Sequence, residues 1–317
     1  MSAPTTDILP PDPAGLRRAA ELLASGALVA FPTETVYGLG ADARNDNAVA
    51  AIYAAKGRPS FNPLIVHVAS VEAAQRYVQF DDAAYDLAQA FWPGPMTLVL
   101  PLRIDAGISN LVTAGLPTLA IRVPQNALAL DLLTLFDGPV AAPSANPSGR
   151  ISPTTAQHVV DGLSGKIAAV LDGGACSVGL ESTIIRTEPE LQLLRPGGLP
   201  VEQIEAALGQ TVRGAAIISE TPDAPGQLLS HYAPNAPVRL NATQAKPDEV
   251  LLGFGPSGGT LNLSVTGDLH EAAANLFSML RLLDEKGASR IAVAPIPDHG
   301  LGRAINDRLA RAAAPRD

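Results

Sequence analysis

The sequence predicts an α/β fold in two parts: a larger part that mixes helices with parallel and antiparallel strands, and a smaller α/β part near the C-terminus. Short apolar runs typical of buried strands alternate along the chain with amphipathic stretches of helical period. With 317 residues, 47% hydrophobic and 17% charged, the chain can bury two cores. A proline-rich stretch at about 210–237 separates the parts and is read as a linker.

Composition and charge narrow the class of protein. The formal net charge of −9 argues against a broad nucleic-acid-binding surface, since clustered Lys and Arg hold phosphate backbones. The single cysteine, Cys176, excludes an internal disulfide and a cysteine-built zinc site. No apolar stretch approaches the ~18 residues of a membrane span, and the N-terminus lacks a signal-peptide pattern. We therefore expect a soluble, cytoplasmic protein without membrane contact.

Residues 26–68 organise the first part of the chain. Residues 27–31 form an apolar run, read as a buried strand, and Pro32 ends it because proline lacks a backbone donor. Residues 32–40 are predicted to be a loop with hydroxyls, one carboxylate and two glycines. Open α/β sheets hold their ligands beyond the carboxyl ends of strands, so this loop is a candidate site.

Two cations follow at the end of the next helix. Asp46 or Asn47 is expected to cap this helix, which runs to Lys56. Lys56 and Arg58 then stand at a loop edge before a second strand at 64–68. The simpler interpretation is that both complement the helix dipole at a surface. The alternative is that they bind an anionic ligand between the two strands.

Start and stop signals place the other elements of the first part. Asp12 begins a first helix that ends at Gly26, and Asn126 caps a leucine-rich helix that runs to Phe136. Residues 105–115 are expected to form a loop. Periodicity predicts further helices at 71–77, at 82–91 and from 152, strands at 97–100, 118–123, 139–142 and one that ends within 170–174, and a hairpin of 182–187 and 191–195.

The second part is predicted to have strands at 238–240, 249–254 and 290–294 and helices at 268–286 and 301–313. The sequence GFGPSG at 253–258 has the spacing of a dinucleotide fingerprint, but no helix is expected to open after it. No GxxxxGK[ST] loop occurs in the chain, so an ATP site would need another architecture than the Walker type.

Several polar residues in apolar surroundings have two interpretations. His67 alternates with apolar residues and is either a hydrogen-bonded core histidine or a ligand contact. Arg122 ends an apolar strand and is either ion-paired or ligand-binding. Ser144 and Asn146 lie in a stretch that composition alone describes as a turn. In the sharper interpretation they present a hydroxyl and an amide beside Lys56 and Arg58.

Ordered motifs over most of residues 10–210 tie these features together. PTETVYGLGADA at 32–43 is followed by KGRPSFNPLIVHV at 56–68. The chain resembles the YrdC family, the threonylcarbamoyladenylate synthases that begin threonylcarbamoyladenosine modification of tRNA. Further matching motifs are WPGPMTLVL at 92–100, APSANPSG at 142–149, LESTI at 180–184 and LRPGG at 194–198.

The resemblance implies a fold and a domain order. The expected fold is a YrdC-like open, twisted mixed sheet with helices, plus a smaller Rossmann-like α/β C-terminal domain. PG at 225–226, HYAP at 231–234 and GLGRAINDRL at 300–309 resemble the linker and C-terminal domain of the long, two-domain members. We expect a catalytic domain at 1–210, a linker that reaches over the active site at 211–237 and a C-terminal domain at 238–317.

The resemblance also implies a reaction. L-threonine, bicarbonate or CO2 and ATP would give threonylcarbamoyl-adenylate and pyrophosphate, for modification of position 37 of tRNAs that read ANN codons. The product would pass to a tRNA threonylcarbamoyl transferase complex, and a weak tRNA contact is left open. Because an anion attacks a polyanion, catalysis needs alignment and charge neutralisation more than a nucleophile. No carboxylate cluster has metal-ligand spacing, so Mg2+ would be held mainly by ATP.

Matching the family residue by residue gives candidate site positions. Ala142 can offer only backbone groups, and Tyr232 would reach the nucleotide from the linker. The catalytic positions are Lys56, Arg58, Ser144 and Asn146; the ATP positions are Arg58, Asn62, Thr118, Ser144, Ser152, Arg195 and Tyr232; and the L-threonine positions are Thr35, His67, Arg122, Ala142 and Ser182.

The chain departs from the family pattern in two places, and three rival interpretations stay open. Residues 227–230 lack the basic residue usual in the linker, and Arg186 stands where an acidic residue often follows the strand. The rivals are a carbamoyl-adenylating relative, an RNA-binding module and an inactive relative. The single cysteine disfavours the first, the net charge the second, and the four matched catalytic positions the third.

Overall fold

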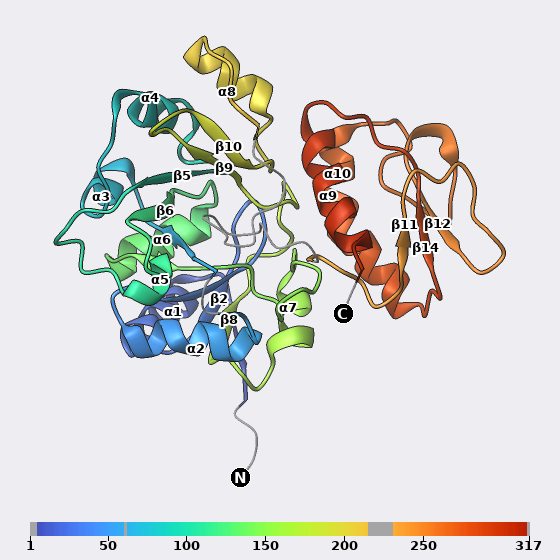
Figure 1. The fold of residues 1–317 in the computed structure, drawn as a ribbon. Helices are drawn as coiled ribbons and strands as arrows, with labels where there is room; N and C mark the ends of the chain where they lie inside the picture. Colours follow the sequence, from blue (N-terminus) through green and yellow to red (C-terminus); the bar gives the residue numbers. More distant parts are fainter. Residues whose placement is uncertain (1–4, 60–61, 215–230, 316–317) are drawn as a thin grey trace.

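The computed structural model describes residues 5–59, 62–214 and 231–315 (Figure 1). A large mixed sheet and its helices form the first domain, and a small parallel sheet with two long helices forms the C-terminal domain. The predicted α/β class, with a mixed sheet, helices and a smaller second domain, is confirmed. Of the predicted linker, residues 215–230 lie outside the described residues.

The large sheet combines parallel and antiparallel neighbours. Near its centre β4 and β6 run parallel, so both strands end at the same edge. In spatial order its strands are β1 (Asp7–Leu9), β8 (Ala169–Leu171), β2 (Val29–Phe31), β3 (Gly38–Asp42), β7 (Val140–Ala141), β4 (Ile65–His67), β6 (Thr118–Arg122), β5 (Met96–Pro101), β9 (Thr183–Arg186) and β10 (Gln192–Arg195).

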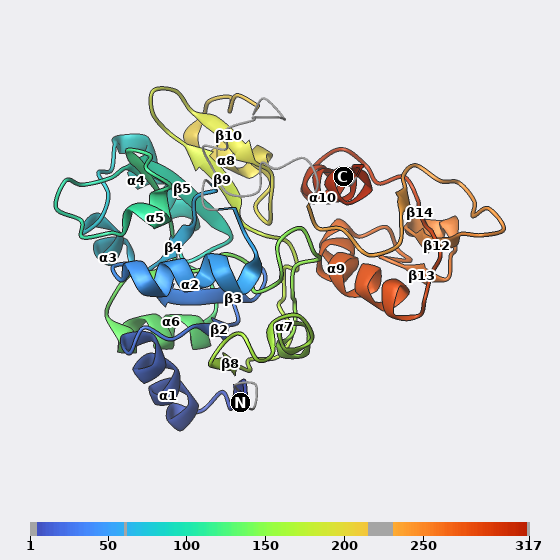
Figure 2. The ribbon, with the colours of Figure 1, turned by 60° about the horizontal axis from the view of Figure 1, so that its bottom comes forward.

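Helices cover both faces of this sheet. One core packs α1 (Pro13–Ala24) and α6 (Ala127–Phe136) on β2, β7 and β8, whereas a larger core packs α2 (Asp46–Lys56) on the opposite face (Figure 2). The remaining helices of the domain are α3 (Val71–Gln75), α4 (Asp82–Phe91), α5 (Asn110–Thr113), α7 (Ala156–Leu163) and α8 (Val201–Leu208).

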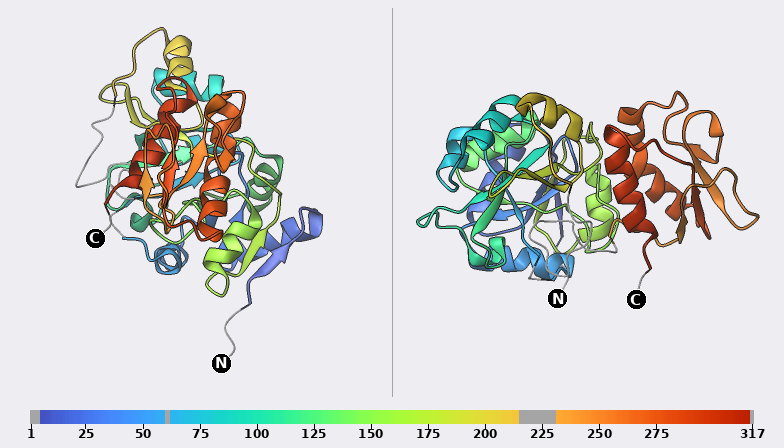
Figure 3. Two further views of the ribbon diagram at one scale, coloured as in Figure 1. Left: turned by 90° about the vertical axis from the view of Figure 1, so that its right-hand side faces the viewer. Right: turned by 45° about the horizontal axis from the view of Figure 1, so that its top comes forward.

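The C-terminal domain is built on four strands whose pairings are all parallel. Their order is β11 (Val238–Arg239), β14 (Ile291–Val293), β12 (Val250–Gly253) and β13 (Leu261–Asn262), with a 3-10 turn, η1 (Gly255–Ser257), after β12. Both long helices, α9 (Leu269–Glu285) and α10 (Leu301–Ala313), lie between this sheet and the first domain (Figures 1 and 3). The C-terminal domain therefore faces the first domain with helices.

Several boundaries differ from those expected. The predicted loop at 32–40 ends in a strand, β3, and the predicted loop at 105–115 contains the short helix α5. Asn45, not Asp46 or Asn47, caps α2, and Thr155 caps a helix that was expected from Ser152. The elements β1, β13 and α8 were not predicted, because β1 and β13 are too short to show a period and α8 begins without a side-chain cap.

The two domains share buried contacts. Val36, Ile151 and Leu180 of the first domain belong to one apolar cluster with Tyr232 and the C-terminal helices. Thr154 and Ser278 are joined by a 2.9 Å hydrogen bond between hydroxyls. Among the described residues, no helix is long and apolar enough to cross a bilayer.

Candidate active site

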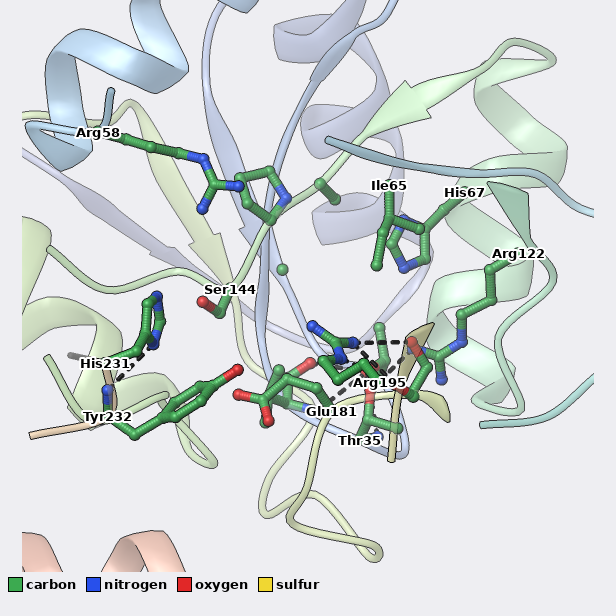
Figure 4. Close-up of a pocket in the computed structure, with 16 residues that line it drawn as sticks. Thr35, Arg58, Ile65, His67, Arg122, Ser144, Glu181, Arg195, His231 and Tyr232 are labelled. Carbon is green, nitrogen blue, oxygen red and sulfur yellow. Dashed lines mark hydrogen bonds between the residues drawn. The ribbon is translucent and has the colours of Figure 1, made fainter. Parts of the chain in front are cut away.

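A polar cavity opens where several segments of the first domain meet the end of the linker. Parallel β4 and β6 end here with His67 and Arg122, and the loop after β7 adds Ser144 (Figure 4). The space between the lining side chains is about 560 Å3, part of it open to solvent. The lining residues are Thr33, Thr35, Val36, Gly38, Arg58, Ile65, His67, Arg122, Ala142, Pro143, Ser144, Glu181, Ser182, Arg195, His231 and Tyr232.

Arg122 is the buried cation at one end of the cavity. Its Nη2 lies 2.5 Å from Glu34 Oε1, its Nη1 donates to Thr35 Oγ1 at 2.9 Å, and its Nε donates to the Gly94 carbonyl at 3.1 Å. A guanidinium has five N–H donors, so these contacts fix its orientation without using all of its N–H groups. Arg122 therefore forms an ion pair with Glu34 and also lines the cavity.

His67, Ala142 and Ser182 lie at the same end. The His67 ring stands edge-on to Phe31 at 6.1 Å, and burial, with the charge of Arg122, lowers the pKa of His67 to about 3. Its Nδ1 has no hydrogen-bond partner among the described residues. Ser182 Oγ is 2.7 Å from Thr97 Oγ1. All five positions matched to L-threonine therefore line one cavity.

Arg58 adds positive charge at the other end, and Arg195 lies next to Ser182 (Figure 4). Arg58 Nη2 donates to the Pro63 carbonyl at 3.0 Å, and its Nε has no partner among the described residues. Burial lowers the pKa of Arg58 to about 10, so it stays charged at neutral pH. Arg195 Nη2 donates to the Ser182 carbonyl at 2.8 Å. A Cβ on Gly197, just after β10, would lie 2.3 Å from the Glu181 carbonyl, so glycine is required where the chain passes the Glu181 backbone.

Lys56 does not line the cavity but holds the loop of Ser144 and Asn146. Its Nζ donates to the backbone carbonyls of Ser144 and Asn146, both at 2.5 Å, and Lys56 is not among the lining residues. Burial and the charge of Arg58 lower the pKa of Lys56 well below its ordinary value. The Asn146 amide donates to the carbonyls of Pro147 and Arg150. Lys56 and Asn146 thus shape the loop that presents Ser144.

The structure brings only some of the matched ATP positions into the cavity. Arg58, Ser144, Arg195 and Tyr232 line it, whereas Asn62, Thr118 and Ser152 do not. Asn62 is fully buried and its side-chain amide has no partner among the described residues. Thr118 begins β6. Because Ile65 pairs with Ala120 in the parallel ladder, Thr118 lies opposite Pro63. The carbonyl of Pro63 accepts a hydrogen bond from Arg58.

Sequence reasoning missed two buried carboxylates and one cation of the C-terminal domain. Glu34 pairs with Arg122 as described, and Glu181 accepts from Ser152 Oγ at 2.5 Å and pairs with Arg308 Nε at 2.7 Å. His231, beside Tyr232, also lines the cavity. The available signal was a glutamate in each of two matched motifs otherwise rich in hydroxyl and apolar residues. The presence of these glutamates does not predict which residues they pair with.

The described residues hold no group of three or more His, Cys, Asp or Glu side chains that could bind a metal ion. Glu181 is the one carboxylate among the described residues that line the cavity, and Ser152 and Arg308 already engage both of its oxygens. These residues therefore do not form a magnesium cage.

Two neutral buried histidines should make folding sensitive to mild acid. Burial is the main cause that lowers the pKa of His67 and of His231 to about 3. Below about pH 6.5 the unfolded chain binds protons that the folded chain excludes, so the free energy of unfolding should fall by up to about 1.4 kcal/mol per pH unit for each histidine. Denaturant unfolding between pH 7 and 5 measures this slope.

His67→Asn should make that slope shallower, because it removes one of the two groups that cause it. Equal slopes in wild type and His67→Asn would mean that the buried imidazole does not stay neutral in the folded chain.

Comparison with known proteins places the chain in a family. Residues 21–197 match the Sua5/YciO/YrdC family, described as telomere recombination, and residues 199–314 match the family described as threonylcarbamoyl-AMP synthase, C-terminal domain. The threonylcarbamoyl-AMP synthase of Pyrococcus abyssi (strain GE5 / Orsay) is 42% identical, covering 95% of this chain and 94% of its own. That of Bacillus subtilis (strain 168) is 41% identical, covering 98% and 96%.

A solved structure is similar over the same extent. The crystal structure of P. abyssi Sua5 complexed with L-threonine superposes with a TM-score of 0.90 at 40% identity and covers 97% of this chain and 98% of its own. Both the sequence matches and this superposition include the C-terminal domain. The chain therefore belongs to the Sua5/YrdC family of threonylcarbamoyl-AMP synthases, in its long two-domain form.

Proposed function

We propose that this chain synthesises L-threonylcarbamoyl-adenylate from L-threonine, bicarbonate or CO2, and ATP, with release of pyrophosphate. One observation carries the proposal: all five positions matched to L-threonine and four matched to ATP line a single cavity. Three arginines and one carboxylate face it, so the cavity is cationic although the chain carries a net charge of −9. The relatives' name and the L-threonine complex of P. abyssi Sua5 support the same reaction.

The amino acid would bind at the Arg122 end. The unused N–H groups of Arg122 suit the carboxylate of threonine, and the hydroxyls of Thr35 and Ser182 suit its polar groups. His67 would stay neutral, because its pKa is about 3, and could accept or donate one hydrogen bond without repelling the ammonium group. Ala142 would contribute backbone contacts only.

The nucleotide would bind at the Arg58 end. Arg58, Arg195 and the Ser144 hydroxyl would hold phosphate oxygens, and the Tyr232 hydroxyl points toward the centre of the cavity (Figure 4). Lys56 would act as a positioning residue for the loop of Ser144 and Asn146, since its Nζ already serves two carbonyls. Asn62, Thr118 and Ser152 would support this end without lining the cavity.

The chemistry needs little covalent help from the chain. The threonine amine adds to the carbon of CO2, or to bicarbonate with loss of water, and gives a carbamate. A carbamate oxygen then attacks the α-phosphorus, and the bond to the bridging oxygen breaks, so that pyrophosphate leaves with the electron pair. The arginines would align the reactants and offset the charge that gathers on the phosphate oxygens. Mg2+ would enter with ATP as part of the substrate.

The domain boundaries belong to the proposal. We propose 1–210 as the catalytic domain, 211–237 as a linker over the active site and 238–317 as the C-terminal domain. His231 and Tyr232, at the end of the linker, line the cavity, which supports the linker's role. The product would pass to a tRNA threonylcarbamoyl transferase complex in the cytoplasm, for position 37 of tRNAs that read ANN codons.

The decisive assay is pyrophosphate release from ATP. The proposal expects release only when L-threonine and bicarbonate are both present, and little release with L-serine or without bicarbonate. Release driven by carbamoyl phosphate in place of threonine would favour the carbamoyl-adenylating alternative. Salt-sensitive tRNA binding without any pyrophosphate release would favour the RNA-binding alternative.

A further inference from the structure

A residue of the C-terminal domain reaches the wall of the active-site cavity. Arg308, on α10, is 1% exposed, and its Nε donates to Glu181 Oε2 at 2.7 Å. Glu181 lines the cavity, and its other oxygen accepts from Ser152 Oγ at 2.5 Å. Asp307 holds the same guanidinium, with its Oδ2 at 2.5 Å from Arg308 Nη1. Arg308 is therefore fixed in place and joined directly to a cavity residue.

The same guanidinium also holds the ring of Tyr232. Arg308 Cζ lies 5.0 Å from the centre of that ring, a cation–π distance. Phe277 of α9 stacks on the ring at 5.6 Å with an interplanar angle of 25°. The backbone N–H of the neighbouring His231 donates to the Arg311 carbonyl at 3.3 Å. Both helices of the C-terminal domain thus orient the linker residue whose hydroxyl enters the cavity.

Glu181 creates an electrostatic problem for a nucleotide site. Burial by itself would raise the pKa of Glu181, but the charges of Arg308 and Arg195 and the hydrogen bond from Ser152 hold it below its ordinary value. The carboxylate is therefore ionised and faces a cavity proposed to hold a triphosphate. An ionised carboxylate without a buried cation beside it would repel that ligand and weaken its binding.

We infer that Arg308 is a positioning residue for nucleotide binding, which acts from the C-terminal domain by neutralising Glu181 and orienting the Tyr232 ring. This inference rests on the proposed function and gives the C-terminal domain a direct part in it. Arg308 itself does not line the cavity, so it acts through Glu181 and Tyr232 and not by touching the substrate. The amino-acid end, around Arg122, has no contact with it among the described residues.

The test compares Arg308→Met with a matched control. Arg308→Met should raise the KM for ATP by about tenfold or more, the usual scale for removing one member of a buried charge pair. The KM for L-threonine should stay near the wild-type value. Arg281→Met is the control, because Arg281 also comes from the C-terminal domain and donates to a first-domain carbonyl, that of Ile151, at 3.0 Å, but does not contact Glu181 or Tyr232. Its KM for ATP should not change.

A second variant separates charge compensation from domain docking. Adding Glu181→Gln to Arg308→Met removes the unpaired carboxylate, so the KM for ATP should fall back toward that of Glu181→Gln alone. The KM for ATP of Arg308→Lys should lie between those of wild type and Arg308→Met. The double variant also guards against misfolding of the single one. The inference is overturned if Arg281→Met raises the KM for ATP equally, or if Glu181→Gln deepens the loss.

Calorimetric titration measures the affinity of wild type and variants for ATP without requiring any reaction. It therefore tests the role of Arg308 independently of the proposed reaction. A wild-type chain that binds ATP but releases no threonine-dependent pyrophosphate would refute the proposed reaction and leave the Arg308 comparison valid. Equal ATP affinity in wild type and Arg308→Met would refute the inference and leave the reaction untouched.

Discussion

Replacing Arg122 by methionine is expected to lower kcat/KM for L-threonine by about a thousandfold and to destabilise the fold, two effects that a second substitution can separate. The activity should fall because Arg122 lines the cavity beside the other positions matched to L-threonine and has N–H groups left for a carboxylate. The stability should fall by about 3–5 kcal/mol because Glu34 would be left buried without its partner.

Glu34→Gln in the Arg122→Met background is the separating variant. It removes the orphaned charge, so the free energy of unfolding should recover, while threonine-dependent pyrophosphate release should remain lost. Denaturant unfolding and steady-state kinetics measure the two quantities. If the double variant regains both stability and a normal KM for threonine, Arg122 serves the fold alone and the threonine site lies elsewhere.

Replacing Arg58 by methionine is expected to lower kcat/KM for ATP by about a hundredfold or more, on the scale of one lost charge contact in a dry phosphate site. Arg58 is partly exposed, lines the cavity and forms no ion pair with the described residues, and its Nε has no hydrogen-bond partner among them. Because no carboxylate is orphaned, stability should change little. Threonine affinity should stay close to wild type.

Arg44→Met is the matched control for that experiment. Arg44 precedes α2 as Arg58 follows it, but its side chain is 44% exposed and pairs with Asp42 on the surface. Its loss should leave kcat/KM for ATP unchanged. A similar loss in both variants would show that general surface charge, and not the cavity, governs nucleotide binding.

Local signals predicted much of the fold. The helices α4, α6 and α10 agree with the expected bounds, because side-chain caps mark α4 and α6 and a clear apolar period marks α10. β3 was missed because its glycines suggest a loop, although they are needed in the sheet: a Cβ on Gly40 would lie 2.9 Å from the Phe31 ring. Glycine is favoured both in turns and where two strands approach closely, so the sequence alone does not distinguish the two cases.

The sequence predicted many of the residues that line the cavity, but not their geometry. A motif can show that Lys56 is present, but not that its Nζ faces two carbonyls instead of a ligand. Glu181 and Arg308 lie 127 positions apart, and no periodicity or spacing links them. Long-range pairs of this kind depend on how two domains pack, which is decided by tertiary structure and not by local sequence.

The central claim is that one cationic cavity joins a carboxylated amino acid to the α-phosphorus of ATP. Labelled bicarbonate tests this claim most directly. The chain is incubated with L-threonine, ATP and carbon-13 bicarbonate, and the nucleotide product is analysed by mass spectrometry. The account predicts an adenylate that contains threonine and one carbon-13 atom, absent in the Arg122→Met and Arg58→Met variants. Unlabelled threonyl-adenylate, or AMP alone, would contradict it.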